Sequence, residues 1–208
     1  MSAGERHPWV VGVAGASGTP YAAAVLRGLL DAGECVDLVV SRAARLTLLD
    51  ETGLRFRDAH WEADLAEWLG RPLDDVDVRY WAAGDLAAGP SSGSYPAKGM
   101  VVVPATTASI AGIALGLSKD LLQRAADVTI KERRPLVVVP RETPWTATTL
   151  RHLLMLAEAG VVVLPASPGF YAGADDVAAL VDFVAGKVLD VIGVEHKLFR
   201  RWTGVPLE

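Results

Sequence analysis

The chain has 208 residues, enough for one domain with a full hydrophobic core, and 51% of them are hydrophobic. Its formal net charge of −5 argues against a nucleic-acid surface, although it is compatible with a local basic pocket. A single cysteine, Cys35, excludes a disulfide framework, and no apolar run approaches the roughly 20 residues of a membrane helix, so we expect a cytoplasmic protein without a membrane partner.

Short apolar runs alternate with amphipathic stretches along the chain, which predicts strands alternating with helices. The predicted strands are 9–13, 36–40, 76–81 at a sheet edge, 100–103, 136–139 and 161–164. The predicted helices run from 20 to about 31, 42 to 51, 64 to 69, onward from 109, 119 to 131, 146 to 159 and 175 to 191. Uninterrupted apolar strands are typical of sheets buried on both faces, so we predict an α/β fold with a mostly parallel sheet. We expect one domain, 1–208, with 195–208 as a C-terminal arm.

Chemistry is expected at the carboxyl ends of the strands, where open α/β sheets bind their ligands. These ends carry small or hydroxylated loops and one Arg/Glu pair: Gly15, Ala16 and Ser17; Ser41; Thr106, Thr107, Ala108 and Ser109; Arg141 and Glu142; and 167–171. Such loops offer phosphate the free N–H groups and the positive end of a helix. The glycine spacing is not that of G-x-G-x-x-G, no acidic residue ends the second strand, and no G-x-x-x-x-G-K-[ST] occurs. A mononucleotide such as FMN therefore fits better than NAD or a nucleoside triphosphate.

The stretch 124–144 concentrates positive charge around the apolar run 136–139. Its basic residues are Arg124, Lys131, Arg133, Arg134 and Arg141. Either they form an anion site, or they are a solvated helix end and ordinary strand caps. The four histidines have no metal-ligand spacing, so no metal site is expected.

Four motifs resemble the UbiX/Pad1 family of flavin prenyltransferases, and the resemblance runs from Val10 to Trp202. They are G-A-S-G (15–18), G-S-Y-P (93–96), R-A-A-D-V-T-I-K-E-R-R-P-L-V-V-V-P-R-E-T-P (124–144) and P-A-S-P-G-F-Y (165–171). The resemblance implies a Rossmann-like, flavodoxin-type, three-layer α/β/α domain that attaches a dimethylallyl group from dimethylallyl phosphate to N5 and C6 of reduced FMN. The product, prenylated FMN, serves UbiD-type decarboxylases. The family acts without a metal and usually assembles as a dodecamer.

The resemblance also assigns roles to single residues. It places FMN on Gly15, Ala16, Ser17, Ser41, Thr106, Thr107, Ala108, Ser109 and Arg124. It places the prenyl phosphate on Lys131, Arg141, Glu142, Tyr171 and Lys187, with Trp202 and Glu51 as further pocket positions. The catalytic candidates are Ser17, Glu51, Lys131 and Glu142. The chain departs from the family at Thr106, where P-C-S is frequent, at Leu86, where some members have Trp, and at Lys187, where Arg is frequent.

The chemistry of the proposed residues suits this reaction. Loss of phosphate from an allylic carbon develops negative charge on phosphate, which Lys131, Arg141 and Lys187 would stabilise. Glu142 could act as an acid or base. Two alternatives remain: a non-catalytic FMN carrier, and a thiol-peptide decarboxylase of the same fold. The second uses a histidine near the first two βα units, and none lies between Thr19 and Glu51.

Overall fold

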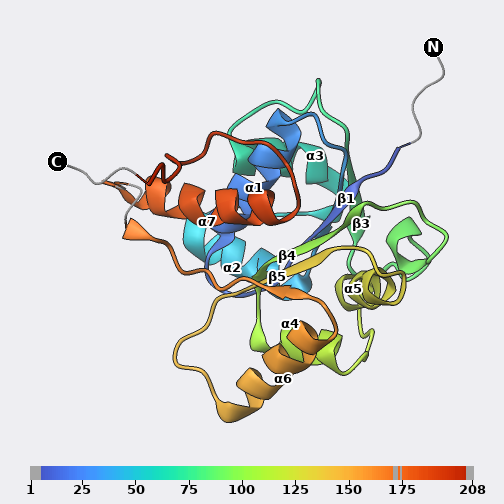
Figure 1. The fold of residues 1–208 in the computed structure, drawn as a ribbon. Coiled ribbons are helices and arrows are strands. Elements are labelled where there is room, and N and C mark those ends of the chain that lie inside the picture. Colours follow the sequence, from blue (N-terminus) through green and yellow to red (C-terminus); the bar gives the residue numbers. More distant parts are fainter. Residues whose placement is uncertain (1–5, 171–172, 174, 205–208) are drawn as a thin grey trace.

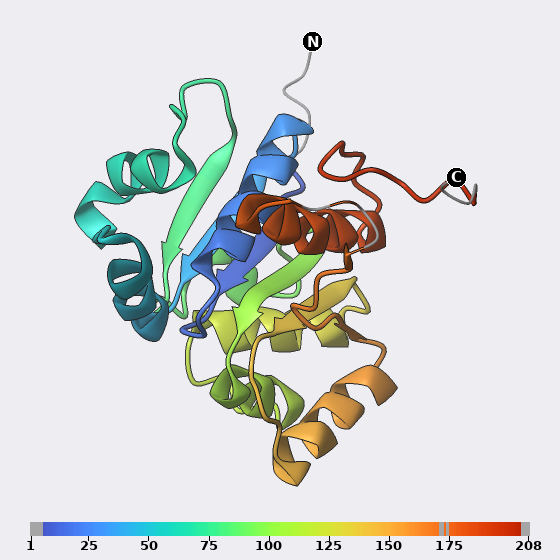
Figure 2. The ribbon, with the colours of Figure 1, turned by 90° about the vertical axis from the view of Figure 1, so that its left-hand side faces the viewer.

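The computed structural model describes residues 6–170, 173 and 175–204, and it shows one sheet between two helix layers (Figures 1 and 2). The strands are β1 (Trp9–Val13), β2 (Val36–Val40), β3 (Val78–Ala82), β4 (Gly99–Ala105), β5 (Leu136–Pro140) and β6 (Val162–Val163). Every strand pair among the described residues is parallel. The predicted α/β class and the three layers are therefore confirmed, and β3 lies at the sheet edge as expected.

The strand order is β3-β2-β1-β4-β5-β6, which is the doubly wound order of Rossmann-type domains. The chain winds outward from β1 to β3 and then returns to lay β4 on the other side of β1. Winding therefore reverses between β1 and β4, and a crevice opens at their carboxyl ends. This reversal positions the candidate site.

Each face of the sheet has its own hydrophobic core, because each is covered by different helices (Figure 1). One face carries α1 (Thr19–Asp31), α2 (Arg42–Thr52), α3 (Trp61–Leu69) and α7 (Val177–Val191). The other carries α4 (Thr107–Ala114), α5 (Leu121–Lys131) and α6 (Ala147–Glu158). Two short 3-10 turns complete the elements, η1 (Asp58–His60) and η2 (Gly89–Ser91). None of the helices in the described part of the chain is long and apolar enough to cross a membrane.

Among the element boundaries that differ from the prediction, two have identifiable reasons. The strand predicted at 100–103 extends to Ala105, past Pro104, because the pairing with β5 is irregular between Val102 and Ala105 and does not require an N–H at the proline. Helix α3 begins at Trp61 rather than 64, and η1 leads directly into it.

A buried ion pair ties the start of the chain to the amino edge of the sheet. Asp37 on β2 is fully buried, and Arg6 donates to its Oδ1 over 2.6 Å. The Arg6 guanidinium also donates to both oxygens of Asp77, and the Tyr95 hydroxyl donates to Asp37 Oδ2 over 2.7 Å. Tyr95 belongs to the segment 83–98, so one carboxylate holds three separate parts of the chain together.

We expect Arg6→Ala to lower the free energy of unfolding by about 2–3 kcal/mol, because it leaves the Asp37 carboxylate buried without its cation. Urea denaturation measures this change. Arg71→Ala is the matched control, since it removes an exposed ion pair with Asp31 and should cost less than about 1 kcal/mol. Equal losses for the two variants would contradict this account of the buried pair.

Candidate active site at the carboxyl edge of the sheet

The loop that follows β1 lies directly against the start of α2. A Cβ on Gly15 would stand 2.5 Å from Ala43 Cβ and 2.7 Å from the Ala43 carbonyl carbon, so only glycine fits there. The Thr47 hydroxyl donates to Gly15 O over 3.0 Å and fixes the loop. Ser41, at the end of β2, caps α2 by accepting from Ala44 N over 3.1 Å. The predicted flavin residues of the first two loops therefore stand together.

Glu51 occupies the amino end of α1. Its carboxylate accepts from Gly18 N over 2.8 Å, from Thr19 N over 2.9 Å and from the Thr19 hydroxyl over 2.6 Å. Burial alone would raise the pKa of Glu51, but hydrogen bonds from Thr19, Ser17 and the two backbone N–H groups outweigh it and lower the pKa. An anionic ligand would be repelled from this helix end. The sequence did not single out Thr19, whose buried hydroxyl is visible only in the structure.

The amino end of α4 is closed by neutral hydroxyls instead. Thr106 is the N-cap, and its Oγ1 accepts from Ser109 N over 3.0 Å and donates to Ser109 Oγ over 2.9 Å. The N–H groups of Thr107 and Ala108 lie in the first turn, where a helix offers no internal acceptor. These N–H groups, the hydroxyls and the helix dipole together make a donor set that fits the phosphate of FMN.

Arg141 and Glu142 follow β5 and border a cavity of about 490 Å³. Its walls are Pro140, Arg141, Glu142, Thr143, Pro144, Trp145, Pro165, Ala166 and Ser167. Arg141 Nε donates to Ser17 O over 2.8 Å, which joins the loops after β1 and β5 across the end of β4. The Glu142 side chain is exposed and accepts from Thr143 N over 2.9 Å, and its backbone oxygen accepts from Trp145 Nε1 over 2.5 Å. A cation and a carboxylate thus stand beside the β1 loop.

Two arginines of the basic stretch hold the segment 83–98 against α5. Arg124 Nε donates to Ser91 O over 3.1 Å, and its Nη1 lies 2.9 Å from Asp127 Oδ2. Arg134 Nη2 donates to Gly93 O over 2.7 Å. Arg134 therefore has a structural role in holding the segment 83–98. A flavin contact for Arg124 stays a prediction.

Three predicted phosphate or pocket residues lie toward the amino edge of the sheet. Lys131 is the last residue of α5, at the opposite end of β5 from Glu142, and pairs with its neighbour Glu132. Lys187 lies in the last half of α7, two residues before Leu189, which packs on Gly28 near the end of α1. Trp202 is 62% exposed on the arm beyond α7. Tyr171 lies outside the described residues.

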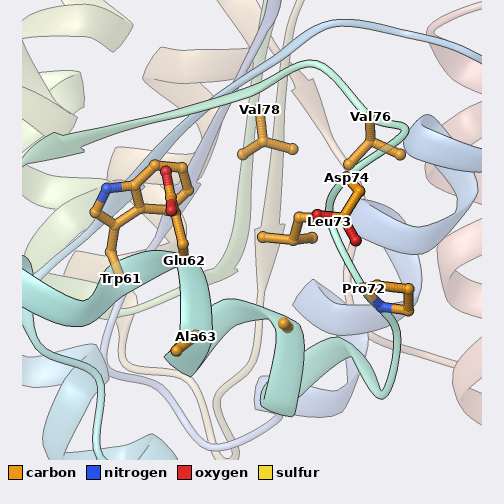
Figure 3. A pocket seen from close by; sticks show the side chains of 9 residues that line it. Trp61, Glu62, Ala63, Pro72, Leu73, Asp74, Val76 and Val78 are labelled. Atoms are coloured by element: carbon orange, nitrogen blue, oxygen red, sulfur yellow. The ribbon is translucent and has the colours of Figure 1, made fainter.

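A second cavity, of about 460 Å³, lies between α3 and the approach to β3 (Figure 3). Apolar side chains such as Trp61 and Leu73 line it, and its only charged lining residues are Glu62 and Asp74, both acidic. It does not suit an anionic ligand. Within the described ranges, no three His, Cys, Asp or Glu side chains gather closely enough to hold a metal ion.

Comparison with known proteins gives consistent similarities. The sequence profile of the Flavoprotein family matches residues 2–189. The flavin prenyltransferase UbiX of Streptomyces coelicolor is 70% identical over 206 residues, which cover 95% of each chain. The crystal structure of AnUbiX in complex with FMN and dimethylallyl pyrophosphate has a TM-score of 0.85 at 34% identity and covers 97% of this chain and 100% of that one. A dodecameric FMN-dependent UbiX-like decarboxylase from Escherichia coli O157:H7 has a TM-score of 0.84 at 36% identity and covers 95% and 100%.

We expect Glu51→Gln to destabilise the protein by about 0.5–1 kcal/mol at pH 7, because it removes a carboxylate from a helix amino end. The folded pKa of Glu51 lies below its ordinary value of 4.5, so its contribution is present above that pH and is lost as the pH falls below it. Thermal unfolding of both proteins between pH 7 and pH 3 measures the difference. Asp50→Asn, an exposed neighbour on α2, is the control for loss of a carboxylate at pH 7; a constant Glu51 difference down to pH 3 would refute the prediction.

Proposed function

Because the chain belongs to the Flavoprotein family, and within it to the UbiX-type flavin prenyltransferases, we propose that it transfers a dimethylallyl group from dimethylallyl phosphate to reduced FMN. The bound flavin supplies the nucleophile, with new bonds at N5 and C6, and prenylated FMN is the product. The similar AnUbiX structure, which holds both FMN and dimethylallyl pyrophosphate, supports this pair of ligands.

One observation carries the proposal: the hydroxyl-capped amino end of α4 and the Arg141–Glu142 cavity lie at the same edge of the sheet, and Arg141 also bonds to the β1 loop at Ser17 O. The first suits the flavin phosphate and the second suits an allylic phosphate. Gly15, Ala16, Ser17 and Ser41 follow β1 and β2, on the other side of β4 at the same edge, and there we place the flavin ring. Two phosphate-bearing molecules can therefore meet with their reacting atoms at this edge.

The residues of the cavity have distinct tasks. Breaking the allylic C–O bond leaves negative charge on phosphate, which the Arg141 guanidinium stabilises. The exposed Glu142 carboxylate accepts or returns a proton at the phosphate or at the flavin carbon that loses its hydrogen. Ser17 and Glu51 share one hydrogen-bonded group and hold the β1 loop in position.

We further propose that a neighbouring copy completes the site. Lys131 and Glu142 are separated by the full length of β5, about 16 Å of extended chain, so one subunit cannot place both on the same phosphate. Lys187 and Trp202 likewise lie toward the amino edge. The similar Escherichia coli protein is dodecameric, and we propose the same assembly here. Lys131, Lys187 and Trp202 then reach the cavity of an adjoining subunit.

We place the reaction in the cytoplasm and propose that the product passes to a UbiD-type decarboxylase. A reduced flavin and the single thiol of Cys35 both suit a reducing compartment. The thiol-peptide decarboxylase alternative is disfavoured, because no histidine lies between Thr19 and Glu51. The FMN-carrier alternative is separated by the experiment below.

Anaerobic incubation with reduced FMN and dimethylallyl phosphate should yield a flavin heavier by one five-carbon prenyl unit, detected by mass spectrometry of the extracted flavin. A parallel incubation with the diphosphate identifies the preferred donor. Arg151→Ala, an exposed arginine on α6, is the control and should form product normally. Recovery of bound but unmodified FMN with both donors would identify the protein as a carrier.

Subunit mixing tests the shared site. Glu142→Gln and Lys131→Met should each slow product formation at least about tenfold when present in every subunit. In randomly mixed assemblies, about one site in four combines the intact Glu142 of one chain with the intact Lys131 of its neighbour, so about a quarter of wild-type activity should return. If both residues act within one chain, mixing restores nothing.

A further inference from the structure

Lys187 stands beside a carboxylate that could neutralise it. Asp190 lies three residues further along α7, and its Oδ2 is 3.9 Å from Lys187 Nζ, at the outer limit of an ion pair. Lys187 is 46% exposed and Asp190 is 21% exposed. A lysine has a compact charge on a flexible stem, so its ammonium can turn toward the carboxylate or toward a ligand. The other partners of Asp190 therefore decide whether the Lys187 ammonium binds Asp190 or a ligand.

Asp190 is engaged from the other side by the C-terminal arm. Arg201 grips both oxygens, with Nη2 2.7 Å from Oδ1 and Nη1 3.0 Å from Oδ2. His196 Nε2 lies 3.0 Å from Oδ1, and its Nδ1 accepts from Leu198 N over 3.2 Å, so the network assigns the proton to Nε2. Although burial raises the pKa of Asp190, hydrogen bonds from Arg201 and His196 lower it overall.

Packing holds this arm on α7. Gly186 leaves room for it, since a Cβ there would lie 2.5 Å from Phe199 and 2.6 Å from His196. The rings of Phe199 and Phe183 are 5.0 Å apart, and the Arg201 guanidinium lies over the Phe199 ring, 5.5 Å from its centroid. The Arg201 fork is therefore presented to Asp190 in a defined position rather than by a free tail.

We propose that Arg201 is a positioning residue that occupies the Asp190 carboxylate and so keeps the Lys187 ammonium available for the phosphate of the prenyl donor. This inference rests on the proposed function, which gives Lys187 that phosphate as its ligand. Without Arg201, Asp190 would attract the lysine and repel the donor phosphate at the same time. Removing the competition of Asp190 matters because position 187 holds a lysine. An arginine there could bind phosphate through two N–H groups and would lose less of that binding to Asp190.

Other charges near this group do not replace Arg201. A cavity of about 900 Å³ separates the end of α1 from the arm, and its charged lining residues are Asp31, Glu34, Glu195, Lys197 and Arg201, with His196 beside them. Three of these are carboxylates, of which Asp31 is paired with Arg71 and Glu34 with Lys98. Loss of Arg201 therefore makes the surroundings of Lys187 more negative, and a nearby anionic ligand is disfavoured.

The test is steady-state kinetics of Arg201→Ala with dimethylallyl phosphate as the varied substrate and reduced FMN saturating. We expect the KM for the donor to rise about fivefold to tenfold, because the unpaired Asp190 carboxylate acts on Lys187 and the donor phosphate at short range with only partial screening. The affinity for FMN should not change. Arg201→Ala combined with Asp190→Asn should return the KM to near the wild-type value, because the competing carboxylate is gone. Arg200→Ala, an exposed neighbour on the same arm, is the matched control and should leave the KM unchanged.

Each outcome has one meaning. An unchanged KM in Arg201→Ala overturns the proposal. A raised KM that Asp190→Asn does not restore also overturns it, because Arg201 would then act only through the structure of the arm and not by pairing with Asp190. If the wild-type protein forms no prenylated flavin, the proposed function fails first, and that result is read from the wild type alone.

Discussion

Burial of both faces of a parallel sheet is the constraint on which the rest of this molecule depends. The four central strands, β1, β2, β4 and β5, are buried along their whole length and almost entirely apolar, so they leave little room for polar chemistry within the layers. Reactive side chains can stand only where strands end and helices begin. Because the winding reverses between β1 and β4, the loops of the two halves diverge at one edge and leave a crevice between them.

Electrostatics then divides that edge into unlike parts. The amino end of α1 is filled by the Glu51 carboxylate, whereas the amino end of α4 is capped by the Thr106 hydroxyl and retains its preference for anions. The two helix ends thus favour opposite ligands. Arg141 ties the second anion site to the β1 loop through Ser17 O.

The cations are distributed between both edges of the sheet, and this distribution is what connects catalysis to assembly. Arg141 stands at the carboxyl edge, while Lys131 and Lys187 stand toward the other. In the assembly proposed above, each subunit contributes half of a phosphate site at each edge and unlike edges meet. The C-terminal arm, which holds Arg201 on Asp190, then lies where it can tune the half that a neighbour receives.

The sequence by itself determined the class of fold, the approximate place of each main strand and helix, and the loops that would carry chemistry, because apolar periodicity and helix-opening residues are local properties. It also identified the family through long motifs such as 124–144. The sequence did not reveal that Glu51 closes α1, that Arg134 holds the segment 83–98, or that Lys131 and Glu142 lie at opposite ends of β5. Those facts depend on which distant residues the strand order brings together. Arg124 and Lys131 belong to one motif but are seven residues apart on α5. Lys131 and Glu142 belong to the same motif but lie on either side of β5, at opposite edges of the sheet. Only the tertiary structure separates them.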